Sequence, residues 1–475
     1  MSHTTPLSAD SEPFAPFEAK MRQAGLNDAA VRAFAGAYAA LRKGETGLIP
    51  ESAIEPARDL PSAEALASQP RAELLAQTVV IKLNGGLGTS MGLEKAKSLL
   101  PVRGTDTFLD LIARQILRLR EKTGGTAPRF LLMNSFSTSA DTRAHLAAHQ
   151  PGLGDPVESE LMQNRVPKVL AGTLEPLAWP AQPDLEWCPP GHGDIYACLL
   201  GSGWLDRLLA EGIRYAFVSN SDNLGATLDE TLLAYFADSG LSFLMEVTRR
   251  TAADRKGGHL ARRLSDGRLL LRESAQCPKA DEEAFQDIGR HQYFNTNNLW
   301  IRLDRLKEIL EENDGLIPLP IIVNKKTADP RDAQSPAVIQ LETAMGAAIE
   351  CFADAGAIDV PRTRFAPVKT TADLLAVRSD AYVLTEDLRL ELDPSRQGQP
   401  PRLQLDQAYC KLVDGLDATF PHGAPSLREC RSLTIHGPLV CGPDVVFRGD
   451  VVLRNHTDSP VPLASGVHEG ESALG

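Results

Sequence analysis

Apolar residues along the chain follow several distinct spacings. Between Phe14 and Leu41 they recur at helical intervals that are interrupted near residues 25–27, and a shorter helical pattern covers residues 72–76. From Thr78 onward, apolar runs of strand length alternate with helical patterns. The predicted strands are 79–83, 130–133, 215–218, 241–247 and 299–301, and the predicted helices include 108–120 and 228–236. This alternation predicts an α/β fold with a mostly parallel sheet.

The last hundred residues contain a six-residue repeat. One apolar series is Leu433, Leu439, Val445 and Val451, and a second is Ile435, Cys441, Phe447 and Leu453. This period is typical of a parallel β-helix, in which each hexad forms one flat side of a coil, whereas two hairpins with chance spacing are the alternative. The chain is therefore predicted to have a helical N-terminal annex (1–77), a central α/β domain (78–380) and a β-rich C-terminal domain (381–475), with the repeat at about residues 430–456.

Composition narrows the classes of partner. The chain has 475 residues, of which 43% are hydrophobic, so it can bury a large core. With 49 basic and 62 acidic residues its formal charge is −13, which argues against nucleic acid or an anionic membrane as a partner. No apolar stretch approaches the roughly 20 residues of a membrane span. Seven scattered cysteines without a Cys-x-x-Cys pair suggest neither a disulfide framework nor structural zinc, and we expect a cytoplasmic location.

The strongest chemical signal follows the first predicted strand. Residues 84–92 read Asn-Gly-Gly-Leu-Gly-Thr-Ser-Met-Gly, and Lys95 and Lys97 come soon after. Closely spaced glycines let the backbone turn sharply and present N–H groups to an anion, while the lysines add positive charge. The run is neither a P-loop nor the dinucleotide fingerprint, because its glycines fall as G-x-G-x-x-x-G and no Gly-Lys-Ser/Thr follows. A nucleoside triphosphate fits this pattern; a purely structural turn is the alternative.

A carboxylate stands at the end of another predicted strand. Asn220, Asp222 and Asn223 follow the apolar run 215–218. Ligands of parallel sheets bind beyond the carboxyl ends of the strands, and an oxygen donor there suits Mg²⁺ near phosphates. A helix or turn cap at Asp222 is the alternative reading.

Two polar segments complete the candidate chemistry. His192 lies between two glycines in 189–194 and could act as a base or as a hydrogen-bonding residue, and no serine or cysteine nucleophile is evident with it. The carboxamides within 295–298 precede a predicted strand and offer paired donors and acceptors for sugar hydroxyls. An asparagine-rich turn without a ligand is the alternative for that segment.

These motifs, taken in chain order, resemble a known family. They are Lys82-Leu-Asn-Gly-Gly-Leu-Gly-Thr-Ser-Met-Gly with Lys97-Ser98, Leu132-Met-Asn-Ser-Phe, Pro189-Pro-Gly-His-Gly-Asp, Asn220-Ser-Asp-Asn-Leu-Gly, Lys256-Gly-Gly, Phe294-Asn-Thr-Asn-Asn-Leu-Trp and Val368-Lys-Thr-Thr-Ala-Asp-Leu-Leu. The set resembles the eukaryotic-type UTP–glucose-1-phosphate uridylyltransferases, also called UDP-glucose pyrophosphorylases. The resemblance is dense over residues 78–375 and extends to the C-terminal repeat.

The resemblance implies both a fold and a reaction. The fold is a Rossmann-like nucleotide-diphospho-sugar transferase domain with a mixed sheet, followed by a small left-handed β-helix. The reaction is the Mg²⁺-dependent conversion of UTP and glucose 1-phosphate into UDP-glucose and diphosphate. A pyrophosphorylase that makes UDP-N-acetylglucosamine or UDP-galactose, and a catalytically silent UDP-sugar sensor, are the alternatives. Because the β-helix is abbreviated, the existence of a homo-oligomer is left open.

The resemblance also assigns roles to individual residues. Nucleotide contacts fall on Leu83, Asn84, Gly85, Gly86, Gln163, Gly191, Asn220 and Asp222, with Gln163 reading the uracil. Sugar contacts fall on His192, Asn220, Gly258, Glu273, Asn295 and Asn297. Asp222 is the expected Mg²⁺ ligand, and Lys97 and Lys369 are the expected catalytic, phosphate-binding lysines. One departure is Ala96, because eukaryotic members of the family usually have proline before the loop lysine.

Overall fold

The computed structural model describes residues 13–251 and 254–474, and the chain divides into two compact units. Unit 1 is drawn from Met1–Ile81, Leu161–Val218 and Glu230–Asp359. Unit 2 is drawn from Lys82–Glu160, Ser219–Asp229 and Val360–Gly475. Each unit is therefore assembled from three separate stretches of chain. The division at residues 77 and 380 stays a prediction.

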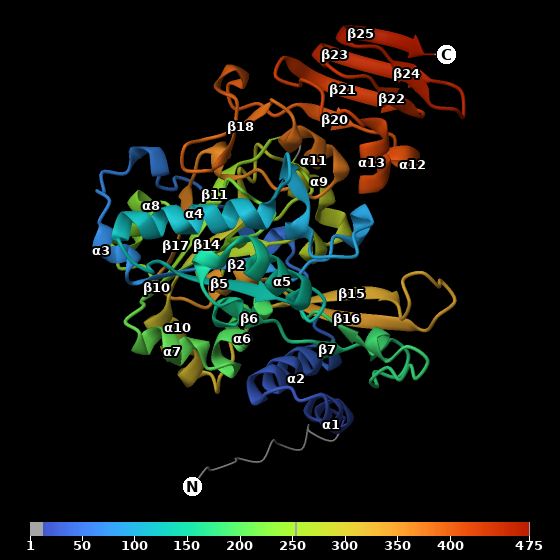
Figure 1. The fold of residues 1–475 in the computed structure, drawn as a ribbon. Helices are drawn as coiled ribbons and strands as arrows, with labels where there is room; N and C mark the ends of the chain where they lie inside the picture. Colours follow the sequence, from blue (N-terminus) through green and yellow to red (C-terminus); the bar gives the residue numbers. More distant parts are fainter. Residues whose placement is uncertain (1–12, 252–253, 475) are drawn as a thin grey trace. The chain divides into compact units, whose positions relative to one another are not determined.

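A mixed β-sheet forms the centre of unit 1 (Figure 1). Its strands in unit 1 include β1 (Ile54–Pro56), β10 (Tyr215–Asn220), β11 (Phe243–Arg249), β12 (His259–Arg263), β13 (Leu269–Arg272), β14 (Tyr293–Arg302) and β17 (Ala355–Asp359). Strand β14 runs antiparallel to β10, β11 and β12, whereas β11 and β17 are parallel. The mixed sheet implied by the resemblance is confirmed, and the mostly parallel sheet expected from alternation is wrong. A short turn connects β12 to its antiparallel neighbour β13, without the long crossover that parallel neighbours require, and α9 (Glu282–Gln286) lies between β13 and β14.

Two helices at the start of unit 1 match the predicted annex. They are α1 (Ala15–Gln23) and α2 (Asp28–Arg42), and the break between them contains Gly25 with a φ of 78°. The Asn27 side chain caps α2 by accepting a hydrogen bond from Ala30 N (3.0 Å). The apolar faces of both helices are buried in one cluster with Val166 and Leu341. Helix α2 lies beside α6 (Ile195–Gly201) and β15 (Ile321–Thr327) (Figure 1).

The remaining elements of unit 1 are short helices and three small strand pairs. They are α3 (Ala72–Leu75), β7 (Val166–Pro167), β8 (Val169–Leu170), β9 (Trp187–Cys188), α7 (Trp204–Ala210), α8 (Glu230–Asp238), α10 (Leu303–Glu312) and β16 (Ala337–Thr343). Strand β16 pairs antiparallel with both β15 and β8, and β7 pairs with β9. The single-turn helices that matter below are η8 (His192–Asp194) and η12 (Met345–Glu350).

Unit 2 contains the predicted strand and helix around residues 108–133. Strand β2 (Thr78–Asn84) begins in unit 1 and ends in unit 2, where α4 (Phe108–Thr123), β5 (Arg129–Asn134), α5 (Ser139–His149) and α11 (Thr371–Arg378) follow along the chain. Helix α4 begins with a capping box formed by Thr107 and Asp110 and ends at Gly124, which has a φ of 64°. Smaller elements are β3 (Pro101–Arg103), β4 (Asp106–Thr107), β18 (Tyr382–Leu384) and β19 (Leu390–Leu392), and β6 (Glu160–Met162) begins in unit 2 and ends in unit 1.

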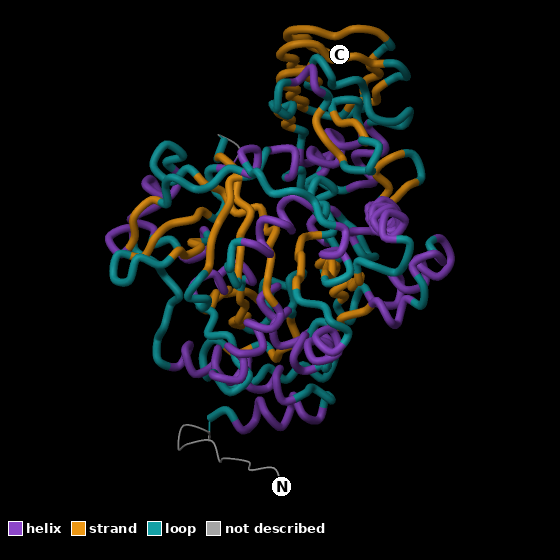
Figure 2. Tube along the Cα trace, turned by 90° about the vertical axis from the view of Figure 1, so that its left-hand side faces the viewer, coloured by secondary structure: helices purple, strands orange, loops and turns teal. Residues whose placement is uncertain are grey.

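The C-terminal repeat of unit 2 forms parallel strands. These are β21 (Cys430–His436), β22 (Leu439–Cys441), β23 (Val445–Asn455), β24 (Val461–Leu463) and β25 (Gly466–Leu474). The strand β20 (Arg402–Gln404), which pairs with β21, and the short helices α12 (Gln407–Cys410) and α13 (Val413–Thr419) precede them. Leu433 pairs with Val451 and Ile435 with Leu453, so each partner lies three hexads along the chain. Figure 2 draws these strands as stacked layers near the C-terminus. Parallel pairing excludes the alternative of two hairpins, whose strands would be antiparallel, and the left-handed sense stays a prediction.

Two observations concern the surroundings of the chain. Within the described ranges, no helix combines the length and the apolar character that crossing a membrane requires. All seven cysteines are free thiols, as their scattered spacing predicts. Burial raises the pKa of the Cys188 thiol to about 12, which keeps that buried thiol protonated and unreactive.

Candidate active site

The glycine-rich turn of unit 2 begins where β2 ends. Asn84, its first residue, is buried, and its amide donates to Asn134 Oδ1 (2.8 Å) and Thr142 Oγ1 (3.0 Å). Ser221 Oγ donates to Asn84 Oδ1 (3.3 Å). The Asn84 side chain is therefore committed to holding the turn in place. Its predicted nucleotide contact would have to come from its backbone.

Backbone contacts fix the rest of the turn. Gly85 O accepts from Ser135 Oγ (2.8 Å), and Gly86 O accepts from Lys97 N (3.1 Å). Gly88 has a φ of 67°, and a Cβ on it would approach Lys97 Cγ to 3.4 Å. Gly86 is exposed, and a Cβ there would meet no atom within 4 Å. The turn thus wraps around Lys97 and leaves Gly86 open.

Lys97 and Asp222 contact each other directly in unit 2. Lys97 Nζ lies 2.7 Å from Asp222 Oδ2, and both side chains are largely buried. Lys97 Nζ also donates to Val368 O, and Val368 N donates to Asp222 O (3.2 Å). Lys369 follows at once; it is exposed, and its backbone N donates to Asp373 Oδ2 (2.9 Å) at the start of α11. Unit 2 therefore brings the Lys97 and Asp222 side chains together and places the Lys369 segment against them.

The oxygens of Asp222 are suited to a hard cation. Asp222 Oδ1 is buried and accepts no hydrogen bond from any described residue. Over residues 13–251 and 254–474, no three His, Cys, Asp or Glu side chains gather in a group that could hold a metal ion. A single protein carboxylate fits Mg²⁺, which retains water and binds phosphate oxygens. The expected Mg²⁺ site at Asp222 stays a prediction.

Leu83 and Asn220 lie on either side of this group in unit 2. Leu83 is half-buried, and its carbonyl accepts from Ser221 N (3.1 Å). Asn220 is the last residue of β10 and is half-buried, and its carbonyl accepts from Asn223 N (3.4 Å). Because these bonds tie the segment after β10 to the end of β2, Asp222 is held beside the glycine-rich turn.

Gln163 and Gly191 contact each other in unit 1. Gln163 Nε2 donates to Gly191 O (3.0 Å). Gly191 has a φ of 80°, and a Cβ on it would lie 2.4 Å from Thr343 O. Thr343 N donates in turn to Pro190 O (2.9 Å). Gly191 is therefore fixed by close packing against β16, and the amide nitrogen of Gln163 is directed at its carbonyl.

The hydrogen bond of His192 identifies the protonated ring nitrogen. Met345 N donates to His192 Nδ1 (2.9 Å), so the hydrogen of the neutral ring is on Nε2. Nδ1 already accepts this bond and Nε2 carries the ring hydrogen, so neither nitrogen has a lone pair with which to remove a proton. This geometry favours the hydrogen-bonding interpretation of His192 over the base.

Four predicted sugar-contact residues lie together in unit 1. A Cβ on Gly258 would come within 2.5 Å of Glu273 Oε2, and Gly258 O accepts from Asn295 N (3.2 Å). Asn295 Oδ1 accepts from Asn297 N (2.9 Å), and Asn297 has a φ of 62°. A left-handed backbone is uncommon outside glycine but is tolerated by asparagine. The contacts fix the group, and its role toward a sugar stays a prediction.

Residues 295–298 lie inside β14, so the alternative of an asparagine-rich turn before the strand is wrong. The pairing of β14 with β11 contains an irregularity beside Glu246. Buried Glu246 accepts from Asn298 Nδ2 (3.0 Å) and Trp300 Nε1 (2.9 Å). This carboxylate supplies the acceptors that allow polar amides to enter a buried strand. The apolar run 299–301 alone could not predict that the strand extends back through residues 295–298.

Sequence reasoning missed a buried carboxylate next to the predicted uracil reader. Asp194 accepts hydrogen bonds from Asn164, which follows Gln163. The sequence signal for Asp194 was its position, because it is the last residue of the segment 189–194, which contains the candidate residues Gly191 and His192. Nothing in the local sequence connects Asp194 with Asn164, because that contact depends on the fold.

Comparisons with known proteins give this site a context. The family model described as UTP–glucose-1-phosphate uridylyltransferase matches residues 33–448. The chain belongs to this family. A UTP–glucose-1-phosphate uridylyltransferase of Saccharomyces cerevisiae is 44% identical over 393 residues, covering 82% of this chain and 77% of the yeast protein. A Dictyostelium discoideum relative is 38% identical over 413 residues, covering 86% and 78%.

Solved structures of similar proteins extend the comparison. The UDP-glucose pyrophosphorylase of Leishmania major, known in open and closed structures, is 50% identical and covers 98% of this chain and 100% of its own, with a TM-score of 0.93. A mutant of the Leishmania major protein was solved in complex with UDP-glucose. A Trypanosoma brucei protein described as UDP-glucose phosphorylase is 48% identical with a TM-score of 0.90, covering 98% and 100%. Membership of the UTP–glucose-1-phosphate uridylyltransferase family confirms the resemblance, and the roles of single residues stay predictions.

Proposed function

We propose that the chain transfers the uridylyl group of UTP to glucose 1-phosphate, forming UDP-glucose and releasing diphosphate. The observation that carries the proposal is the Lys97 ammonium group held 2.7 Å from the Asp222 carboxylate beside a glycine-rich turn in which Gly86 is open. Family membership and the printed activity of the relatives support the choice of substrates.

The proposed reaction needs charge neutralisation rather than proton removal. A phosphate oxygen of glucose 1-phosphate attacks the α-phosphorus of UTP, a new P–O bond forms, and the bond to the departing diphosphate breaks. The attacking oxygen is already an anion, so neither a base nor a covalent intermediate is required. Two polyanions must instead be held together against their repulsion, which is a task for positioned cations. The neutral tautomer of His192 is consistent with this requirement.

Lys97 and Lys369 are the proposed protein cations. In this structure Lys97 donates to Asp222 and to Val368 O, so phosphate oxygens would have to replace a protein acceptor. Its stem is wrapped by the glycine-rich turn, so that exchange moves the ammonium group without unfolding the loop. The Lys369 side chain is exposed, and its backbone is fixed by Asp373. Its ammonium group can therefore move with the departing diphosphate and neutralise its negative charge.

Asp222 is the proposed holder of Mg²⁺. Its buried Oδ1 without a hydrogen-bond donor supports this role. When bound, the ion would supply positive charge to the triphosphate oxygens. The two oxygens of Asp222 would then have different roles. Oδ2 contacts Lys97, and Oδ1 would bind the ion.

Unit 1 is proposed to supply recognition. Gln163 would read the uracil, and His192 would donate Nε2–H to an oxygen of the sugar phosphate. The group of Gly258, Glu273, Asn295 and Asn297 combines a carboxylate with carboxamides, a set of donors and acceptors that suits hydroxyl groups.

A panel of sugar phosphates tests the proposal. Purified protein is incubated with UTP and either glucose 1-phosphate, galactose 1-phosphate or N-acetylglucosamine 1-phosphate, with and without Mg²⁺, and diphosphate release is measured. We expect release with glucose 1-phosphate that requires Mg²⁺. Faster release with another sugar would overturn the substrate assignment. Binding of UDP-glucose without release from any sugar would favour the silent sensor.

Two finer expectations accompany the proposal. We propose a left-handed sense for the C-terminal coil, as the resemblance implies and as its parallel strands allow. We also propose a cytoplasmic location, which is supported by seven free thiols.

A further inference from the structure

A buried hydrogen-bond network lies beside the predicted uracil reader in unit 1. Its members, Asn164, Asp194 and Cys198, are 8%, 6% and 1% exposed, and we call them the Asp194 network. Asn164 N donates to Asp194 Oδ2 (2.8 Å), and Asn164 Nδ2 donates to Asp194 Oδ1 (3.0 Å). Cys198 Sγ donates to Asp194 Oδ2 (2.9 Å). One carboxylate therefore holds both the backbone and the side chain of Asn164.

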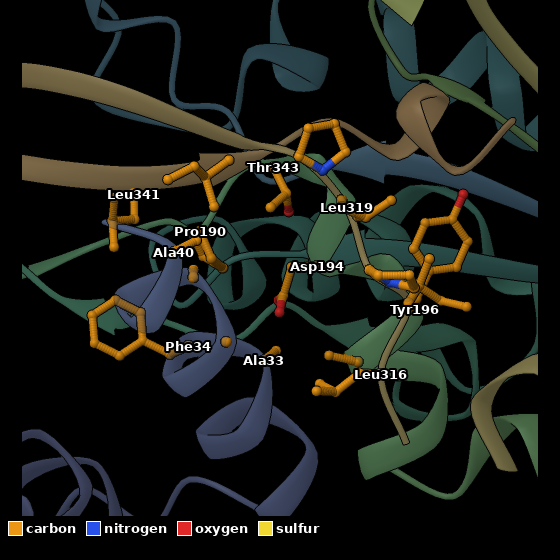
Figure 3. Close-up of a pocket in the computed structure, with 18 of the residues that line it drawn as sticks. Ala33, Phe34, Ala40, Pro190, Asp194, Tyr196, Leu316, Leu319, Leu341 and Thr343 are labelled. Atoms are coloured by element: carbon orange, nitrogen blue, oxygen red, sulfur yellow. The ribbon is translucent and has the colours of Figure 1, made fainter. Parts of the chain in front are cut away.

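Within residues 13–251 and 254–474, no cationic side chain donates a hydrogen bond to the Asp194 carboxylate. Burial raises the pKa of the Asp194 carboxyl, and the bonds from Cys198 and Asn164 oppose that rise. The side chain faces a cavity of about 680 Å³ between α2 and the segment containing Leu316 and Leu319 (Figure 3). A buried carboxylate held only by neutral donors is expensive to maintain, and a capping residue for α6 would not need to be charged. The local fold therefore does not explain why an aspartate stands here.

The Asp194 network connects two segments that meet at Gln163. Asn164 follows Gln163 directly, so the bond to Asn164 N fixes the peptide that precedes the network. Asp194 belongs to η8, and Asp194 N donates to Gly191 O (3.4 Å), the same carbonyl that accepts from Gln163 Nε2. Asp194 is thus bonded to both sides of the contact between Gln163 and Gly191.

We propose that Asp194 is a positioning residue that selects the pyrimidine base by fixing which way the Gln163 amide faces. Gly191 O can only accept a hydrogen bond, so it holds the Gln163 nitrogen and leaves Oε1 on the other side of the amide. The inference rests on the proposed function, in which Gln163 reads the base.

The chemistry of the two pyrimidines explains the selection. Uracil presents an N3–H donor beside an O4 acceptor, whereas cytosine presents an N3 acceptor beside an amino donor. A glutamine amide in a fixed orientation matches only one of these patterns, and an amide that can turn over matches both. With Oε1 directed at the base, Gln163 accepts from N3–H of uracil and opposes N3 of cytosine. Releasing Gln163 should therefore weaken the discrimination between UTP and CTP.

Equilibrium binding tests the proposal independently of turnover. The Kd values of UTP and CTP are measured by calorimetry for the wild-type chain, Asp194→Asn, and the reciprocal swap Asp194→Asn with Asn164→Asp. In Asp194→Asn, one new amide N–H must face a donor, because all three present partners donate. We expect the ratio of the CTP Kd to the UTP Kd to fall by about tenfold, as one lost buried hydrogen bond predicts. The swap restores an acceptor opposite the new amide and should recover most of the ratio.

Matched variants separate positioning from general damage. Cys198→Ser keeps a donor to Asp194 Oδ2 and should leave the ratio unchanged. If Asp194→Asn does not fold, Asn164→Ala carries the same test. It removes the side-chain bonds to Asp194 Oδ1 and to Cys198 Sγ (3.3 Å) and keeps the bond from Asn164 N. An unchanged ratio in a folded Asp194→Asn or Asn164→Ala variant, or equal weakening of UTP and CTP, overturns the proposal. Failure of the transfer reaction in the wild-type chain would instead refute the proposed function, since base selection is read here from binding.

Discussion

Gly86 in unit 2 and three candidate-site glycines in unit 1 are surrounded in different ways. In unit 2, a Cβ on Gly86 would meet no atom within 4 Å. In unit 1, a Cβ on Gly191 would lie 2.4 Å from Thr343 O, and one on Gly193 would lie 2.4 Å from Thr343 Oγ1. A Cβ on Gly258 would approach Glu273 Oε2 to 2.5 Å. Protein packing thus requires glycine at these three positions of unit 1, whereas at Gly86 the protein itself leaves room for a side chain.

This difference accompanies the two roles proposed for the residues of each unit. Packing around Gly191 and Gly258 holds a recognition surface rigid before any ligand arrives. The open turn at Gly86 lets the backbone approach a large anion closely, and its charged neighbours, Lys97 and Asp222, have partners that a ligand could replace. Substitutions at Gly86, Lys97 and Asp222 should therefore affect turnover more than stability, and substitutions at Gly191 and Gly258 should affect stability as well.

Lys97→Ala should have the largest effect on turnover. The lysine is proposed to neutralise phosphate charge, and loss of one preorganised charge or donor lowers kcat by about 10²–10³-fold. Its stem packs against a loop, so the free energy of unfolding should change little. Diphosphate release and urea unfolding are measured for this variant and for Lys95→Ala, an exposed lysine two residues earlier. Near-normal turnover in Lys97→Ala would remove this residue from the mechanism.

Asp222→Asn should change the requirement for Mg²⁺. The amide retains an oxygen ligand but loses the negative charge, and even the loss of outer partners of metal sites lowers affinity by about 10–100-fold. We expect the Mg²⁺ concentration that gives half-maximal rate to rise by about tenfold or more, with partial recovery at high Mg²⁺. The exposed Glu94→Gln serves as the charge-matched control. An unchanged Mg²⁺ dependence would place the ion elsewhere.

The pair Gly86→Ala and Gly191→Ala tests the comparison itself. Gly191→Ala meets Thr343 O and adopts a left-handed backbone, so the free energy of unfolding should fall by about 2 kcal/mol or more. Gly86→Ala should stay within about 0.5 kcal/mol of the wild type because nothing lies near the added methyl group. Its KM for UTP should nevertheless rise several-fold. Equal losses of stability in the two variants would show that the contrast between the units is wrong.

Much of the fold followed from apolar spacing. The strands β2, β5, β10 and β14 and the helix α4 contain the runs that predicted them, and β11, α2 and α8 overlap theirs. The hairpin of β15 and β16 was missed because β15 is half-exposed and carries Asn324, Lys325 and Lys326 in sequence. A strand with such a polar stretch presents neither a continuous nor an alternating apolar pattern.

The site could be predicted only as separate segments. Residue types indicated chemistry at Lys97 and at Asp222, but their 2.7 Å contact joins side chains that are 125 residues apart and requires the fold. The Asp194 network is a similar case, with Asn164 and Asp194 separated by 30 residues. Distant pairings of this kind leave no mark on local spacing, so neither the anchoring of Gln163 nor the partner of Lys97 could be read from one sequence.

Buried carboxylates give the smallest expected effect and the sharpest contrast of sign. Asp110 in unit 2 is 6% exposed; burial alone would raise its pKa, but hydrogen bonds from Thr107, Gln150 and His145 hold it well below its usual range. A carboxyl with a lowered pKa stabilises the fold above its unfolded pKa, and that stability is lost as pH falls through the folded value. Asp194 in unit 1 has a raised pKa, so its contribution is greatest in acid and declines as pH rises through the folded value.

Asp110→Asn and Asp194→Asn should therefore differ in the pH dependence of their stability. At pH 7, Asp110→Asn should lower the free energy of unfolding by about 1–3 kcal/mol, because a buried hydrogen-bond set loses its acceptor. That difference should start to close as the pH falls below the ordinary carboxyl value of 3.8. For Asp194→Asn, the difference in the free energy of unfolding from the wild type should instead shrink as the pH rises above 3.8. Urea unfolding between about pH 3 and pH 8 measures both differences. Slopes of the same sign would mean that the two units do not hold their buried carboxylates in opposite electrostatic environments.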